Sequence, residues 1–433
     1  MHKKVNIFWF RRDLRLHDNH ALYQALNAGL SVLPVFIFDT GILGKLSSKS
    51  DARVSFIYGE IVRIQSELEK FGSSLKVFHA KPADVFRELT EQFEIQAVFA
   101  NKDYEPYAKE RDDKVGEVLN EKGVAFYLFK DQVIFEENGV LKDDGTPYTV
   151  FTPYSKKWKQ VLSETEIPAY PSEKMLHNFI KTAFFSFPDL KELGFEKSTI
   201  AVMPPEISEK IIRNYAKTRD LPGTDGTTRL GVHLRFGTVS IRELSRKAME
   251  WSETFLNELI WRNFFSTILW HFPQVVDKAF KPQYDFIQWR NNEKEFECWC
   301  HGKTGYPMVD AGMRELNATG FMHNRERMVT ASFLTKHLLI DWRWGETYFA
   351  EKLLDFELAS NNGNWQWAAG TGCDAAPYFR IFNPESQQKN FDPKGDYIRK
   401  WIPEIGTMKY PQPIVEHKFA RERALKTYRK ALN

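Results

Sequence analysis

The chain has 433 residues, 42% of them hydrophobic and 27% charged, and its net charge is +3. This is ordinary globular composition, with length for two or three domains. No run of about 18 apolar residues could cross a membrane, and we find no secretory signal in the sequence. Cys298, Cys300 and Cys373 lack C-x-x-C spacing, which argues against a disulfide framework or a zinc site. We therefore expect a cytoplasmic protein without a metal centre.

Short apolar runs alternate with helix-like segments over residues 1–131. The runs have the length and the Val, Ile and Phe content of buried strands. They are VNIFWF (5–10), SVLPVFIFD (31–39), SLKVFHA (74–80), QAVFAN (96–101) and VAFYLFKD (124–131). Strands that alternate with helices predict βαβ units and a Rossmann-like parallel sheet. The polar stretch RRDLRLHDN (11–19) replaces the glycine-rich dinucleotide motif after the first run, which argues against an NAD-type domain.

The pattern changes twice further along the chain. Residues 132–203 carry turn signals with little periodicity, and we predict a long interdomain connection there. Residues 204–433 are dominated by helical periodicity, as in segments 254–272 and 324–342. The predicted fold is an α/β domain over 1–131 followed by a large all-α domain over 204–433.

The stretch GFMHNRERM contains the first candidate binding residues. A helix that begins near His323 places Asn324, Arg325 and Met328 on one face, because they are three or four residues apart. This face presents an amide, a guanidinium and a thioether. A capped amphipathic helix with a solvated face is the alternative interpretation.

The segment NELIWRNFF adds charged and aromatic candidates. Glu258 and Arg262 are four residues apart, so an intrahelical ion pair is one explanation of their spacing. Trp261 lies between them and faces another direction. A Trp face beside arginine donors and a Met suits a flat, anionic, aromatic ligand, which describes a nucleotide.

TDGTTRL (224–230) resembles a phosphate site, since hydroxyls and an arginine stand where a helix is expected to begin. An ordinary helix N-cap would look the same. Tyr215 and Arg219 lie just upstream.

NNGNWQWAAG (361–370) concentrates amides and indoles. Asn361 and Trp365 are four residues apart and would share a helix face, whereas Trp367 would point elsewhere. An Asn amide can serve a ring nitrogen of a redox cofactor, or it can simply be satisfied by backbone groups. Asp355 and Glu357 precede this stretch and are either helix-capping carboxylates or ligands of a sugar hydroxyl.

Together these motifs resemble the photolyase/cryptochrome family, and most closely the class I cyclobutane pyrimidine dimer photolyases. The resemblance runs from FWFRRDLRLHDN (8–19) to YPQPIVEHK (410–418). Its most specific parts are 302–316, 320–328 and 361–384. It implies an α/β antenna domain and a helical domain that holds FAD.

The resemblance also assigns roles to residues. Those that would bind FAD are Tyr215, Thr227, Thr228, Arg229, Leu230, Gly231, Arg327, Asp355, Phe356, Glu357 and Asn361. Among them Arg327 would pair with Asp355, and Asn361 would face the flavin N5. The electron-transfer chain would be Trp365, Trp342 and Trp289. The lesion pocket would comprise Glu258, Trp261, Asn324, Met328 and Trp367. The residues that would contact DNA are Arg219, Glu258, Trp261, Arg262, Asn324, Arg325, Arg380 and Gln387.

The implied activity is light-driven repair of pyrimidine dimers in DNA by electron transfer from excited, reduced FAD. We expect a monomer that acts on DNA and not on membranes. The family alternatives are a cryptochrome-type photoreceptor without repair and a (6-4) photolyase. The segment DYEPYAKERD places Tyr107 and Ala108 where folate-binding members usually have Asn-Glu. Folate is therefore not expected, and the identity of any second antenna chromophore stays open.

Overall fold

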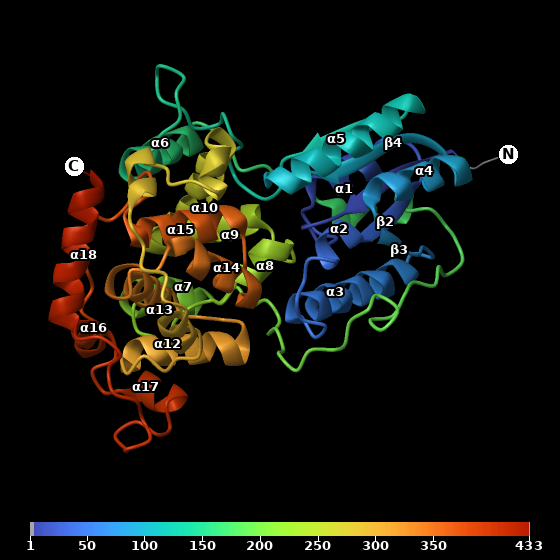
Figure 1. Ribbon diagram of the computed structural model, residues 1–433. Helices are drawn as coiled ribbons and strands as arrows, with labels where there is room; N and C mark the ends of the chain where they lie inside the picture. Colours follow the sequence, from blue (N-terminus) through green and yellow to red (C-terminus); the bar gives the residue numbers. More distant parts are fainter. Residues whose placement is uncertain (1–3, 433) are drawn as a thin grey trace. The chain divides into compact units, whose positions relative to one another are not determined.

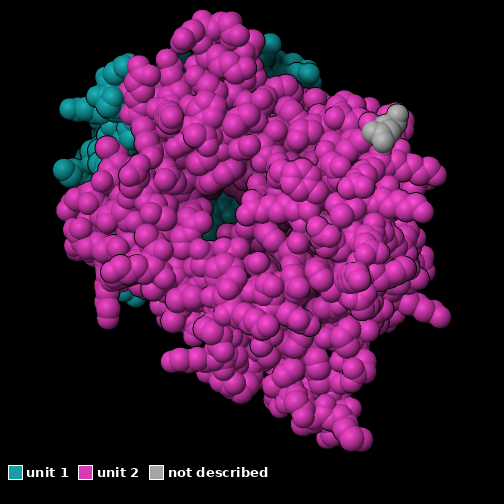
Figure 2. Space-filling view, turned by 90° about the vertical axis from the view of Figure 1, so that its left-hand side faces the viewer, with its two compact units in different colours: residues 1–136, 162–206, 230–247 teal, residues 137–161, 207–229, 248–433 magenta. Residues whose placement is uncertain are grey.

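The computed structural model describes residues 4–432. The chain divides into two compact units. Unit 1 comprises residues 1–136, 162–206 and 230–247, and unit 2 comprises residues 137–161, 207–229 and 248–433. Figure 2 colours the two units, and the face of unit 2 that it shows has a recess near its centre. The domain boundaries at residues 131 and 204 stay predictions.

Unit 1 is built on a five-stranded parallel sheet (Figure 1). Its strands are β1 (Lys4–Phe10), β2 (Val32–Asp39), β3 (Lys76–Ala80), β4 (Glu94–Asn101) and β5 (Ala125–Phe129). The order β3-β2-β1-β4-β5 is that of a Rossmann-type sheet. In the central register, Ile7 lies beside Leu33 on one side and Val98 on the other. The predicted fold class is confirmed, because every apolar run of the first 131 residues forms a strand.

Helices separate the strands of unit 1. They are α1 (His20–Leu26), α2 (Thr40–Leu43), α3 (Ala52–Glu69), α4 (Pro82–Gln92) and α5 (Pro106–Glu121). The short helices η1 (Ser172–Asn178) and α8 (Gly231–Phe236) also belong to unit 1. Helix α9 follows at Ile241–Trp251.

The polar stretch after β1 forms a buried network within unit 1. Arg15 donates to Asp131 at 2.7 Å, and Arg242 donates to the same carboxylate at 2.9 Å. Asn101 at the end of β4 donates to Asp13 at 2.6 Å. These charges are buried but paired, as the cost of burying an isolated charge requires. The stretch that replaces the glycine-rich loop thus has a structural role here.

Unit 2 is helical. Its main helices are α7 (Glu209–Thr218), α10 (Glu253–His271), α11 (Glu293–Cys300), α12 (Pro307–Thr319), α13 (Asn324–Ser332), α14 (Trp342–Lys352), α15 (Leu358–Ala369), α16 (Pro384–Phe391), α17 (Asp396–Trp401) and α18 (His417–Leu432). Shorter turns are η2 (Pro273–Val276), η3 (Pro282–Phe286) and the π-helical η4 (Phe333–His337). Helix α6 (Phe151–Ser163) lies inside the segment that the sequence suggested was a connection. Within residues 4–432, no helix is long and apolar enough to cross a membrane.

Candidate flavin and lesion site

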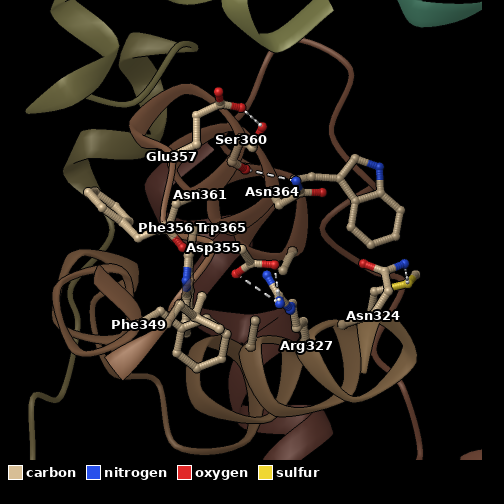
Figure 3. A pocket seen from close by; sticks show the side chains of 15 residues that line it. Asn324, Arg327, Phe349, Asp355, Phe356, Glu357, Ser360, Asn361, Asn364 and Trp365 are labelled. Atoms are coloured by element: carbon tan, nitrogen blue, oxygen red, sulfur yellow. Dashed lines mark hydrogen bonds and ion pairs between the residues drawn. The ribbon is translucent and has the colours of Figure 1, made fainter. Parts of the chain in front are cut away.

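Helices α13, α14 and α15 enclose a cavity in unit 2 together with the turn at residues 353–357 (Figure 3). Amide, guanidinium, thioether, carboxylate and aromatic groups line it. The lining residues are Asn324, Arg327, Met328, Ala331, Phe349, Leu353, Asp355, Phe356, Glu357, Ser360, Asn361, Asn364, Trp365, Trp367 and Ala368. Predicted residues from two separate motifs therefore meet in one cavity.

Helix α15 is held in place by the polar residues of the NNGNWQW stretch. Asn362 donates to the carbonyl of Val275 at 2.9 Å, and Gln366 donates to the same carbonyl at 3.0 Å. Gly363 allows close approach to helix α10, because a Cβ here would overlap the Phe265 ring. The backbone-satisfied interpretation is thus correct for Asn362 and Gln366.

Asn361 differs from its neighbours because its amide is only half satisfied. Its Nδ2 donates to the main-chain carbonyl of Glu346 at 3.1 Å and to Glu346 Oε1 at 2.9 Å. Both bonds fix the amide nitrogen toward α14, so the amide oxygen is available to the cavity that Asn361 lines. Burial raises the pKa of the Glu346 carboxyl, while the bond from Asn361 lowers it. Glu346 was not predicted, since it lies fifteen residues upstream on another helix.

Trp365 is buried beside Asn361. Its side chain is 2% exposed, and its indole Nε1 has no hydrogen-bond partner among the described residues. Gly345 gives the indole room, because a Cβ at that position would overlap Trp365 Cη2. The Phe349 ring meets Trp365 edge-on at 4.9 Å between centroids, and the Trp299 ring does so at 6.1 Å.

Arg327 and Asp355 form an ion pair at the cavity, with Nη2 2.8 Å from Oδ2, as the resemblance implies. Arg327 Nε also donates to the carbonyl of Met322 at 2.8 Å, which fixes the guanidinium plane. One turn before, the Asn324 amide contacts the Met328 sulfur at 3.9 Å. The expected shared face of Asn324 and Met328 is therefore present.

Glu357 is bound to another predicted residue. Arg262 donates to Glu357 Oε1 at 2.6 Å, and Ser360 donates to Oε2 at 2.9 Å. Both Glu357 and Arg262 are nearly buried. The side chain of Glu357 does not cap helix α15, although the residue occupies the N-cap position. Arg262 thus pairs with Glu357, which lies on another element of unit 2.

Glu258 belongs to a chain of charges at the surface of unit 2. It accepts from Arg219, whose neighbour Asp220 accepts from Arg325 at 2.7 Å. The Arg325 guanidinium also stands 3.9 Å above the Phe391 ring. Desolvation raises the pKa of Glu258, and Arg219 opposes this shift. The structure brings these predicted DNA contacts together through Asp220, which the sequence did not suggest.

Trp261 is half-buried and stacked. Its ring lies parallel to that of Phe151, with 3.6 Å between centroids and 3° between planes. The Phe151 main-chain N–H donates to Asp374 at 2.9 Å. One face of the predicted lesion wall is therefore covered by Phe151, a residue that was missed because it is distant in sequence.

The remaining predicted residues lie elsewhere in the described chain. Tyr215 packs edge-on against Phe255, and exposed Arg229 has a positive φ of 52° and pairs with Asp225 at 3.4 Å. Thr227, Thr228, Leu230 and Gly231 precede or begin helix α8. Arg380 is exposed and Gln387 is half-buried on α16. Their roles in binding phosphates or DNA stay predictions.

Trp342 and Trp289 belong to the same apolar core as Trp365. Trp342 is 1% exposed, and Trp289 packs against the core from its edge. The Arg343 guanidinium stands 4.8 Å from the centre of the Trp342 ring. The Trp289 ring meets Tyr428 edge-on at 6.0 Å.

The polar groups of the cavity fit a flavin. The Asn361 oxygen can accept, the Arg327 guanidinium can donate, and Phe356 and Trp367 offer aromatic surface. A flat heteroaromatic ring with polar edges needs this combination.

Known proteins agree with this flavoprotein architecture. A family model described as DNA photolyase matches residues 6–172, and one described as the FAD binding domain of DNA photolyase matches residues 255–409. The chain belongs to the DNA photolyase family. It is an enzyme of that family, with FAD as its cofactor.

Full-length relatives support the assignment. A deoxyribodipyrimidine photo-lyase of Synechococcus is 36% identical, with 95% of this chain and 93% of the relative covered. One of Escherichia coli is also 36% identical, with 99% of each covered.

Solved structures are similar over the whole chain. A class III photolyase from Agrobacterium tumefaciens has a TM-score of 0.87 at 32% identity, covering 100% of this chain and 98% of that one. An archaeal photolyase from Sulfolobus tokodaii, solved with two FAD molecules, has a TM-score of 0.85 at 34% identity, covering 99% of this chain and 100% of that one. A Synechocystis cryptochrome has a TM-score of 0.87 at 24% identity, covers 99% of each chain, and shows the shared fold alone.

Proposed function

We propose that this protein splits cyclobutane pyrimidine dimers in DNA with light, using reduced FAD held in the cavity of Figure 3. The observation that carries the proposal is the fixed amide of Asn361. Its nitrogen is bound to Glu346 and its oxygen is free toward the cavity. An amide accepts a hydrogen bond from a ring N–H, but it has no acidic proton to give to an anionic ring.

The residues that would hold the flavin are Asn361, Arg327, Asp355 and Phe356. The resemblance adds Tyr215 and the 227–231 run on the phosphate side. When bound, reduced FAD supplies one electron to the dimer under light and recovers it after the two ring bonds split. The protein would hold the flavin and the dimer in position, and it would place the Asn361 amide, which has no acidic proton, beside the flavin.

The lesion would lie against Trp261 and Trp367, with Met328 and Asn324 at its edge. Glu258 would hydrogen-bond a thymine edge; desolvation raises the pKa of its carboxyl, and Arg219 opposes that shift. Arginines at the surface of unit 2 would bind the DNA phosphates. Enzymes of this kind rotate the damaged bases out of the duplex, because the bases cannot be reached while they are stacked inside it.

The test is repair of a thymine-dimer oligonucleotide by purified, chemically reduced protein under blue light. Light-dependent recovery of thymine absorbance, absent in the dark, is the expected result. A parallel oligonucleotide with a (6-4) photoproduct should stay unrepaired. Bound flavin without repair of either lesion would contradict the proposal and indicate a photoreceptor.

A further inference from the structure

We propose that Trp299 and Tyr348 form a second electron route to Trp365, separate from the predicted chain through Trp342 and Trp289. The proposal rests on the placement of FAD beside Trp365 in the function proposed above. It concerns the first one-electron step in the reduction of oxidised flavin, before any repair takes place.

The first step is carried by ring contacts of Trp365. The Trp299 indole lies against its ring, at 6.1 Å between centroids and 71° between planes. Phe349 fills the space beside both, 4.9 Å from Trp365 and 6.0 Å from Trp299. Continuous aromatic packing favours tunnelling, because its rate falls steeply with the gap between rings.

Trp299 is rigidly held. It is 0% exposed, and its Nε1 donates to the carbonyl of Thr330 at 3.1 Å. A carbonyl oxygen beside the indole N–H stabilises positive charge on the ring. No guanidinium or ammonium of the described residues stands over Trp299. The Arg343 guanidinium lies 4.8 Å from the centre of the Trp342 ring and is paired with both Asp341 and Asp285.

Tyr348 continues the route to the surface. Its ring lies 5.8 Å from that of Trp299, and its hydroxyl donates to Asn317 Oδ1 at 2.7 Å. The side chain is half-buried and thus reaches solvent. Lys352 Nζ stands 5.6 Å from the ring centre and opposes a positive charge there, so oxidation requires loss of the phenolic proton.

Each step of the route moves one electron, and the last step also releases one proton. Trp365 gives one electron to photoexcited oxidised flavin, and Trp299 gives one electron to the Trp365 cation. Tyr348 then gives one electron to Trp299 and releases its phenolic proton to solvent. An external thiol returns one electron and one proton to the neutral Tyr348 radical.

The experiment blocks the predicted chain and looks for the tyrosine radical. Oxidised holoprotein with ring-deuterated tyrosine and Trp342→Phe is illuminated and frozen, and its EPR spectrum is recorded. We expect a tyrosyl signal that narrows on deuteration. The signal should fall at least tenfold in Trp342→Phe/Tyr348→Phe. It should persist in Trp342→Phe/Tyr127→Phe, since Tyr127 is an exposed tyrosine of unit 1.

A Trp289→Phe background replaces Trp342→Phe if the buried substitution prevents folding. No tyrosyl signal in the blocked protein, or a signal that survives Tyr348→Phe, would overturn the route. Repair by chemically reduced wild-type protein needs no photoreduction. Failure of that assay would therefore refute the proposed function, whereas the EPR result alone decides the route.

Discussion

Asn361 shows how one amide is distinguished from its neighbours by its partners. Asn362 and Asn361 are adjacent and of the same type, yet Asn362 is satisfied by a carbonyl and Asn361 keeps a free oxygen at a cavity. Spacing on a helix predicted that Asn361 and Trp365 share a face, and both residues line the cavity. It could not predict Glu346, because the pairing depends on how α14 packs on α15.

Replacing Glu346 tests the orientation of this amide. Glu346→Leu removes the Oε1 acceptor and leaves the Asn361 amide nitrogen held by the main-chain carbonyl of residue 346 alone, so the amide is less firmly fixed. We expect slower repair by reduced protein and a free energy of unfolding lower by about 0.5–1.5 kcal/mol, the contribution of one hydrogen bond. Glu346→Gln keeps an acceptor oxygen and should repair at close to the wild-type rate. Equal repair by the Leu and Gln variants would contradict a positioning role.

Gly345 offers a second test at the residue scale. A Cβ there would overlap Trp365 Cη2 and Leu334 Cδ2, both in the core. Gly345→Ala should lower the free energy of unfolding by about 1–3 kcal/mol, since overpacking forces side chains from their rotamers. Gly59→Ala is the matched control, because a Cβ at Gly59 on α3 meets nothing within 4 Å. The control should stabilise the protein by up to about 1 kcal/mol. Thermal unfolding followed by circular dichroism compares them.

At the scale of elements, strands were easier to predict than site contacts. The five apolar runs became β1 to β5 because a sheet buried on both faces needs continuous Val, Ile and Phe. Helix α6 was missed because turn residues surround it and its first N–H is bound by Asp374, 223 residues away. The stacking of Phe151 on Trp261 was missed for the same reason. Contacts between distant segments have no periodic signal.

Helix α13 contains a buried carboxyl that should make stability depend on pH. Glu326 is 0% exposed, and neither oxygen has a partner in the described chain. Desolvation first, and then Glu315 and Asp392, raise its pKa well above the ordinary value. The folded protein therefore retains a proton that the unfolded chain releases. Stability should fall as the pH rises above the unfolded pKa, by at most about 1.4 kcal/mol per pH unit.

Glu326→Gln removes this titration and keeps the shape of the side chain. Urea unfolding at about pH 5 and about pH 8 should show that the variant gains stability relative to wild type at the higher pH. The exposed Glu422→Gln substitution on α18 should leave the difference between the two pH values unchanged. A constant gap between Glu326→Gln and wild type would show that Glu326 is not protonated in the fold.

At the scale of the whole molecule, lesion binding and DNA binding should be separable. Trp261 presents a stacking surface, whereas Arg380 presents an exposed charge. Stacking acts on an unpaired base and is worth about 1–3 kcal/mol. A phosphate contact forms with any DNA and releases counterions. Its loss therefore lowers the slope of log affinity against log salt concentration by about one.

Trp261→Ala should therefore weaken binding to dimer-containing DNA by about 1–3 kcal/mol and leave binding to intact DNA almost unchanged. Arg380→Ala should weaken both similarly and flatten the plot of log affinity against log salt concentration. Fluorescence anisotropy with matched oligonucleotides at several salt concentrations measures both effects. Phe151→Ala tests whether Phe151 orients the Trp261 ring. If it does, this substitution should weaken binding to dimer-containing DNA in the same way as Trp261→Ala, but by less. Equal losses on damaged and intact DNA for Trp261→Ala would remove this residue from the lesion pocket, because a stacking wall cannot act on bases that stay paired.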